Sequence, residues 1–178
     1  MIQKLFNKLE PKTSVAKEQM LFSNKQLVNL ILPLFADQIL LLVVTFLSSL
    51  MIAQAGANAL SGVSLVDMIN TFMFFVFIAL ASGGSVVISQ YIGSKNNSMA
   101  EHSAAQLFSF NIVISLVVTV FLVLFRGPII NALFGQADAE VISTASLYFY
   151  LSVFSYPFYS LYQSGNAVFR SIGNTKIP

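Results

Sequence analysis

Four blocks of apolar residues limit what this sequence can fold into. They run over about residues 27–53, 67–91, 104–125 and 145–168. Each block is long enough to supply the about 20 residues that a helix needs to cross the hydrocarbon core of a bilayer. Strands of a membrane barrel would be shorter and would alternate polar with apolar residues, which these blocks do not. We therefore predict an all-α integral membrane protein with four transmembrane helices.

Composition supports this class. Of the 178 residues, 56% are hydrophobic and 9% are charged, whereas soluble domains carry roughly 25% charged residues. A soluble domain of this size has too few interior positions to bury so much apolar side-chain surface. The expected partner of that surface is a lipid bilayer.

Polar segments divide the chain. Residues 1–24 carry four lysines and are predicted to form a cytoplasmic N-terminal tail. Glycine- and asparagine-containing turns near residues 56–58, 93–97 and 135–138 separate the helices of the transmembrane region, residues 25–178. The last residues resemble a loop that leads into another helix, so we expect a chain truncated after its fourth helix.

The lysines and arginines predict the orientation in the membrane. With four helices, eight of the nine basic residues fall on one side, and cytoplasmic loops are the ones enriched in these residues. The eight are Lys4, Lys8, Lys12, Lys17, Lys25, Lys95, Arg170 and Lys176. Arg126 alone lies opposite. We expect a multi-pass protein of a bacterial cell membrane with both ends in the cytoplasm.

Residues typical of catalysis or metal binding are scarce. The chain has no cysteine and one histidine, His102, without a cluster around it, which argues against a metal site. It contains no phosphate-binding loop, nucleophile elbow or His-Glu-x-x-His motif. Its lysines lie in tails and loops and not along one face, unlike those of nucleic-acid-binding domains. We expect a protein that is not an enzyme, with no metal, no cofactor and no nucleic-acid partner.

Asp37 is the clearest polar residue within a predicted span. A charged carboxylate there costs roughly 2.5–3.5 kcal/mol, so its side chain must face the protein interior or water. Pro33 lies one turn earlier and deprives the Asn29 carbonyl of its helical hydrogen bond, which predicts a bend. A bent helix with a nearby carboxylate suits a site for a proton or a cation. Alternatively, Asp37 only bonds a neighbouring helix or lies in a cytoplasmic vestibule.

The fourth predicted helix carries polar residues at spacings of three and four, which places them on one face. They are Tyr148, Ser152, Ser155, Tyr159, Tyr162 and Asn166. Pro157 interrupts the hydrogen-bond ladder within this span and predicts a second bend. Such a face suits a water-accessible cavity for flat organic cations, which aromatic ring faces attract. Helix packing through hydroxyl groups is an equally common use of these residues.

Weaker polar patterns occur on the other helices. Asn111, Ser115 and Thr119 form a stripe on the third helix, for which packing is favoured, although Asn111 is kept as a candidate for lining a cavity. Asn70 is a second such candidate. Asp67 is expected to be an interfacial residue at the N-terminus of the second helix, stabilised by the helix dipole.

Four stretches resemble the multidrug and toxic compound extrusion (MATE) family of cation-coupled drug antiporters. They are Leu32-Pro33-Leu34 with Gln38, Gly56–Leu60 (GANAL), Gly84–Gly93 (GSVVISQYIG) and Phe169–Pro178 (FRSIGNTKIP). The resemblance implies a twelve-helix transporter of two six-helix lobes around a central cavity, which exports organic cations in exchange for H⁺ or Na⁺. This chain would hold four helices of the N-terminal lobe. Because the other helices are missing, it would be inactive alone.

Many members of that family carry a coupling aspartate in the outer half of the first helix. Counting back from Gly56, this position falls on Ser48, so the family role cannot be carried over. Ser48 remains a candidate for lining a cavity, and Asp37 as the ion-coupling residue is our own hypothesis. Two alternative functions stay open: a lipid-linked oligosaccharide flippase of the same superfamily, and a small membrane scaffold or partner subunit.

Overall fold

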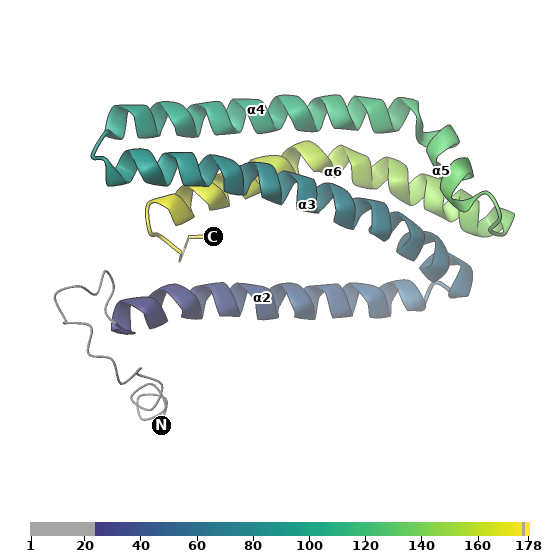
Figure 1. Ribbon diagram of the computed structural model, residues 1–178. Coiled ribbons are helices and arrows are strands. Elements are labelled where there is room, and N and C mark those ends of the chain that lie inside the picture. Colours follow the sequence, from purple (N-terminus) through teal and green to yellow (C-terminus); the bar gives the residue numbers. More distant parts are fainter. Residues whose placement is uncertain (1–23, 176) are drawn as a thin grey trace, which may run out of the picture.

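The computed structural model describes residues 24–175 and 177–178, which form helices joined by short turns. The helices are α2 (Asn24–Ala53), α3 (Ala57–Gly93), α4 (Asn97–Leu124), α5 (Arg126–Phe134) and α6 (Ala139–Ser171) (Figure 1). No strand occurs among the described residues. The predicted all-α class is therefore confirmed. Apart from Asn24, which begins α2, the predicted N-terminal tail lies outside the described residues.

The structure differs from the expected helices at the start of α3 and after α4. First, α3 begins at Ala57 and not near residue 67, because a hydropathy block marks the membrane-embedded part of a helix and not its full length. Second, α5 is a separate short helix after α4, and its proline, Pro128, lies in the first turn, where proline is tolerated. The α2–α3 turn includes Gly56, whose φ of 105° favours a residue without a Cβ atom.

Three described helical stretches are long and apolar enough to cross a membrane. They are Ile31–Ala53, Ala57–Gly93 and Asn97–Leu124. The helix α6 has 33 residues but a more polar sequence. It packs along α3 and α4 (Figure 1), which places it beside two candidate spans. The count of four spans stays a prediction.

The helices α3, α4 and α6 form a three-helix bundle, and α2 lies to one side of it (Figure 1). The chain directions of α3 and α6 are parallel, and α4 runs opposite to both. Phe77, Phe149, Val153 and Tyr156 are fully buried in the core of this bundle. The three residues of α6 recur at spacings of four and three, so they lie on one face of that helix.

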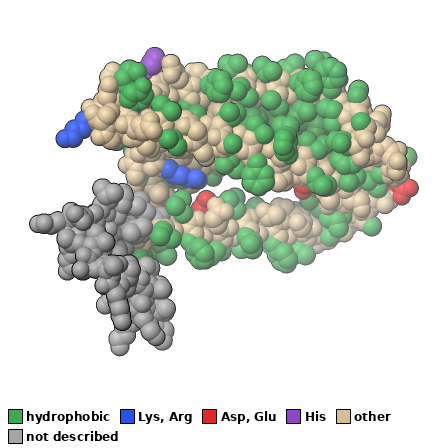
Figure 2. Space-filling model, in the orientation of Figure 1, with side chains coloured by type: hydrophobic (Ala, Val, Ile, Leu, Met, Phe, Trp, Pro, Cys, Tyr) green, Lys and Arg blue, Asp and Glu red, His purple; other side chains and the backbone are tan. Residues whose placement is uncertain are grey.

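Outside this core the surface is apolar. Figure 2 shows hydrophobic side chains spread over the helices, with few charged groups among them. On α2, Leu42 and Met51 are 71% and 73% exposed. Apolar surface of this extent requires lipid or further helices to cover it, because water would disfavour it.

The polar stripe of α4 lies in the contact with α6. The Asn111 side chain is fully buried and donates to Ser164 Oγ at 2.7 Å, and its backbone carbonyl accepts from Ser160 Oγ at 3.0 Å. Thr119 Oγ1 donates to the Val153 carbonyl at 3.2 Å. Asn111 therefore joins two helices and does not face an open space, which agrees with the packing interpretation of the stripe.

We expect a measurable coupling between Asn111 and Ser164. In a double-mutant cycle with Asn111→Ala and Ser164→Ala, the coupling energy should be about 0.6 kcal/mol and at most about 1.7 kcal/mol, the average and the maximum for hydrogen bonds between membrane helices. Unfolding in mixed micelles would measure it. Ser109→Ala serves as the control, because Ser109 is exposed and bonds the carbonyl of Ala105 on its own helix. Additive effects of the two changes would contradict the expected bond.

Candidate functional site

The predicted site residues of α2 lie apart from the bundle. Asp37 is partly buried and accepts one long hydrogen bond from Gln38 Nε2, at 3.5 Å. Ser48 is exposed. The helix continues through Pro33 without interruption, as α6 does through Pro157, so the two bends stay predictions.

A chain of hydrogen bonds joins α3 to α6 in the half of the bundle that includes the α2–α3 turn. The Tyr148 hydroxyl donates to Asp67 Oδ1 at 3.0 Å, and Asn70 Nδ2 donates to the same oxygen at 3.4 Å. The Tyr156 hydroxyl donates to Asn70 Oδ1 at 2.8 Å. Tyr156 and Asn70 are buried, whereas Asp67 is exposed. The chain of bonds thus runs from an accessible carboxylate into the core.

The expected position of Asp67 is wrong. Because α3 begins ten residues earlier, at Ala57, Asp67 is too far from the helix N-terminus to be stabilised by its dipole, which acts within the first turn. Its carboxylate is held instead by the phenol of Tyr148 and the amide of Asn70. No ion pair involves Asp67 within the part of the chain that the structure describes.

An aromatic cluster continues this network along the bundle. The rings of Phe74 and Tyr159 are stacked, with centroids 4.1 Å apart and planes at 28°. Phe74 also meets the edge of Tyr156, with centroids 6.0 Å apart. Gln163 Nε2 donates to the Tyr159 hydroxyl at 3.0 Å. These contacts fix the ring of Tyr159 at the border between buried and exposed surface.

The polar face of α6 runs along the edge of its contact with α3. Ser155 and Tyr162 are exposed, Tyr148, Ser152 and Tyr159 are partly buried, and Asn166 is buried. The Ser155 hydroxyl donates to the Ser152 carbonyl at 2.6 Å, within its own helix. The structure thus brings Tyr148 and Tyr159 into the α3–α6 contact, whereas lining of a cavity by this face stays a prediction.

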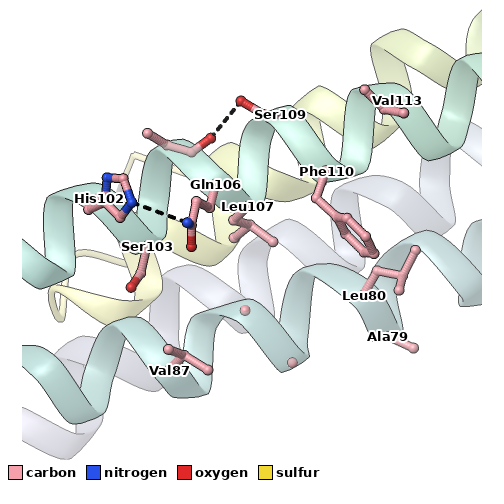
Figure 3. A pocket seen from close by; sticks show the side chains of 13 residues that line it. Ala79, Leu80, Val87, His102, Ser103, Gln106, Leu107, Ser109, Phe110 and Val113 are labelled. Carbon is pink, nitrogen blue, oxygen red and sulfur yellow. Dashed lines mark hydrogen bonds between the residues drawn. The ribbon is translucent and has the colours of Figure 1, made fainter.

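A hollow of about 950 Å³ lies elsewhere, between α3 and α4. Figure 3 shows its wall, to which α3 contributes Leu80 and Val87 and α4 contributes Phe110. At one end, His102 and Gln106 are hydrogen-bonded at 3.1 Å. A smaller hollow of about 460 Å³ borders Asp67. Among the described residues, no group of three acidic, histidine or cysteine side chains is placed to hold a metal ion.

Comparison with known proteins decides the family. The family model described as MatE matches residues 33–178, which include most of α2 and all of α3 to α6. The chain belongs to the MatE family. This confirms the resemblance seen in the four sequence stretches.

Two curated proteins are similar to this MatE chain. "Probable multidrug resistance protein NorM" of Thermotoga maritima is 25% identical over 177 aligned residues, which cover 94% of the chain and 36% of that protein. "Uncharacterized transporter YisQ" of Bacillus subtilis is 26% identical over 113 residues, which cover 64% of the chain and 25% of that protein. The chain therefore spans only about a third or less of the length of these relatives. No solved structure matches it.

Sequence reasoning missed four members of the site in this MatE chain: Asp67 as a bonded carboxylate, Phe74, Gln163 and Tyr156. A signal for Asp67 and Phe74 was present. Asp67, Asn70 and Phe74 recur at spacings of three and four, as a single face of α3 requires. Gln163 follows Tyr159 by four residues, which is one turn of α6.

Proposed function

We propose that this chain forms part of a secondary active antiporter that exports organic cations in exchange for H⁺ or Na⁺. Membership of the MatE family supports a membrane transporter. The name of the Thermotoga maritima relative, a probable multidrug resistance protein, supports drug export as its role. The remaining helices, further partners of this chain, would close the cavity that the α6 face begins.

One observation carries the proposal to organic cations. The stacked rings of Phe74 and Tyr159 are connected, through Tyr156 and Asn70, to the carboxylate of Asp67. Ring faces attract cations by about 0.5–2 kcal/mol, and a carboxylate supplies the compensating charge. Flat molecules that combine a positive charge with an apolar body fit both features. Neutral sugars or anionic substrates fit neither.

Transport would follow from alternating access. Cation binding within a transporter shifts the equilibrium between states that open to opposite sides, provided that the two states bind the cation with different affinity. Asp37 stays our candidate for ion coupling on α2. We also propose that both chain ends are cytoplasmic, as the basic residues predict. In intact cells, Lys95→Cys should resist a membrane-impermeant thiol reagent, and rapid labelling would reverse the orientation.

A dye accumulation assay tests the function. The complete gene product, expressed in bacterial cells that lack their major efflux pumps, should lower the accumulation of ethidium severalfold relative to empty vector. Asp37→Asn should remove most of this effect, because the amide cannot exchange a proton or balance the charge of Na⁺. Asp37→Glu should keep part of it.

The assay tests the export of organic cations separately from the coupling role of Asp37. Ethidium accumulation equal to that of empty vector, with the wild-type protein present in the membrane, would reject the export of organic cations. Full activity of Asp37→Asn would reject the coupling role of Asp37 alone. The flippase alternative is disfavoured, because no lysine or arginine lies within the four apolar blocks to bind a pyrophosphate.

A further inference from the structure

Asp67 is a carboxylate in a helix that is long and apolar enough to cross a membrane. It lies ten residues from the start of α3 at Ala57, which is about 15 Å along the helix. Its neighbours in space are a phenol and an amide, and no cationic side chain pairs with it among the described residues. A carboxylate in a spanning helix needs either a water-filled surrounding or a cation to compensate its charge.

Hydrogen bonds from two helices orient this carboxylate. Both hydrogen bonds from protein groups end on Oδ1, one from Tyr148 on α6 and one from Asn70 on α3. The Asn70 amide is itself oriented, because its oxygen accepts the hydrogen bond of buried Tyr156. No protein donor of the described residues reaches Oδ2, and Asp67 is exposed. One oxygen is thus fixed while the other is open to a ligand.

We propose that Asp67, oriented by Tyr148 and Asn70, binds the coupling ion of this transporter. The site rests on the proposed function and adds to it a second carboxylate, on α3. Its ligand is a small monovalent cation: either a proton on Oδ2, or Na⁺ bound by the carboxylate together with the oxygen of Tyr148. Asp37 differs in that a single long bond from its sequence neighbour holds it.

Competition between the coupling ion and an organic cation for the charge of Asp67 would account for their exchange. Asn70 and Tyr156 connect Asp67 to the ring of Phe74, against which Tyr159 stacks. An organic cation held by these rings is stabilised by the negative charge of Asp67. When the coupling ion neutralises Asp67, this stabilisation is lost and the organic cation leaves. Binding of either cation therefore weakens binding of the other.

Few other titratable groups face this site. Besides Tyr148 and Tyr156, α6 carries Glu140, which accepts a hydrogen bond from Asn58 at 2.7 Å near the start of both helices. Its other titratable groups are Tyr150, Tyr159, Tyr162 and, in the last turn, Arg170. On α2, the acidic residue is Asp37, whose hydrogen bond is with Gln38 of its own helix. Glu101 and His102 lie in the first turns of α4, beside the other end of α3 and roughly 30 Å away along its axis.

On α5, Arg126 lies over the ring of Tyr150, 5.4 Å from its centroid. It therefore faces an aromatic ring and not the carboxylate of Asp67.

Binding and transport measurements on the purified, reconstituted complete gene product test the site. Ethidium binding is followed by fluorescence across pH at constant Na⁺, and across Na⁺ at constant pH. In the wild type, the coupling ion should weaken ethidium binding about tenfold. A response to pH identifies the proton as coupling ion, and a response to Na⁺ identifies sodium.

Asp67→Asn should bind ethidium weakly, with an affinity that changes less than about twofold across the same series. Asp67→Glu, which keeps the charge, should keep the dependence on the ion and shows that the position tolerates substitution. Met68→Leu is the matched control, since Met68 is the adjacent residue and is 70% exposed. It should behave as the wild type does.

The outcomes are distinguishable. If Asp67→Asn keeps the ion dependence of the wild type, the site at Asp67 is wrong, while export of organic cations stands. If wild-type proteoliposomes neither bind ethidium nor move it under an imposed pH or Na⁺ gradient, the proposed function fails, and the site fails with it.

Discussion

Replacing Tyr159 by leucine in the complete gene product should weaken the binding of a planar organic cation by about tenfold. The expected loss follows from the cation–π attraction of one ring, about 0.5–2 kcal/mol, and from the loss of the stack with Phe74 at 4.1 Å. Tyr159→Phe keeps the ring and should retain most of the affinity. Fluorescence titration with ethidium measures both variants.

A neighbouring residue provides the control. Phe158 is also aromatic but is 75% exposed, so Phe158→Leu should leave ethidium affinity within about twofold of wild type. If Phe158→Leu and Tyr159→Leu weaken binding equally, the ring of Tyr159 has no specific role. If neither does, the aromatic cluster is a packing element and substrate binds elsewhere.

Replacing Gly62 by leucine should give the largest loss of stability on α3. A Cβ atom at this position would lie 2.9 Å from the Val141 carbonyl oxygen and 3.1 Å from the Ala145 nitrogen. Both are backbone atoms of α6, so the clash can be relieved only by moving the helix. Overpacking of this kind costs about 1–3 kcal/mol, and leucine should lie at the upper end.

The same helix offers a matched control. A Cβ atom on Gly83 would meet nothing within 4 Å, so Gly83→Leu changes the same residue type without a clash. Thermal unfolding in detergent should show a clearly lower midpoint for Gly62→Leu than for Gly83→Leu. Equal midpoints would mean that α3 and α6 do not approach as closely as this structure has them.

Local sequence patterns were sufficient for the fold class, and they predict that polar residues share one face of α6. Long apolar blocks indicate membrane helices because the bilayer fixes their length. The polar face of α6 was predicted because residues three and four apart share a side of any helix. Neither inference requires knowledge of which helix packs on which.

The remainder of the site depends on tertiary contacts. That Asp67 meets Tyr148, 81 residues later, follows from the parallel packing of α3 on α6, which no local pattern encodes. Asp67 was assigned to a helix terminus because hydropathy marks the embedded part of α3 and not its true start at Ala57. The spacing of Asp67, Asn70 and Phe74 indicates that they share one face of α3. The role of that face follows only when the helix that packs against it is known.

The most direct test of the account is the accessibility of Ser155, an exposed residue on the polar face of α6. The sequence contains no cysteine, so Ser155→Cys introduces a thiol into a chain without background, once any cysteine elsewhere in the complete gene product is replaced. Phe154→Cys is the control, one residue earlier and about 100° around the helix. Both variants are treated with a water-soluble, membrane-impermeant thiol reagent in open membrane fragments.

If the polar face of α6 lines the path of organic cations, Ser155→Cys reacts readily and ethidium slows its reaction severalfold, whereas Phe154→Cys reacts slowly with or without ethidium. Equal reaction of the two variants, or a rate for Ser155→Cys that ethidium leaves unchanged, would contradict the account.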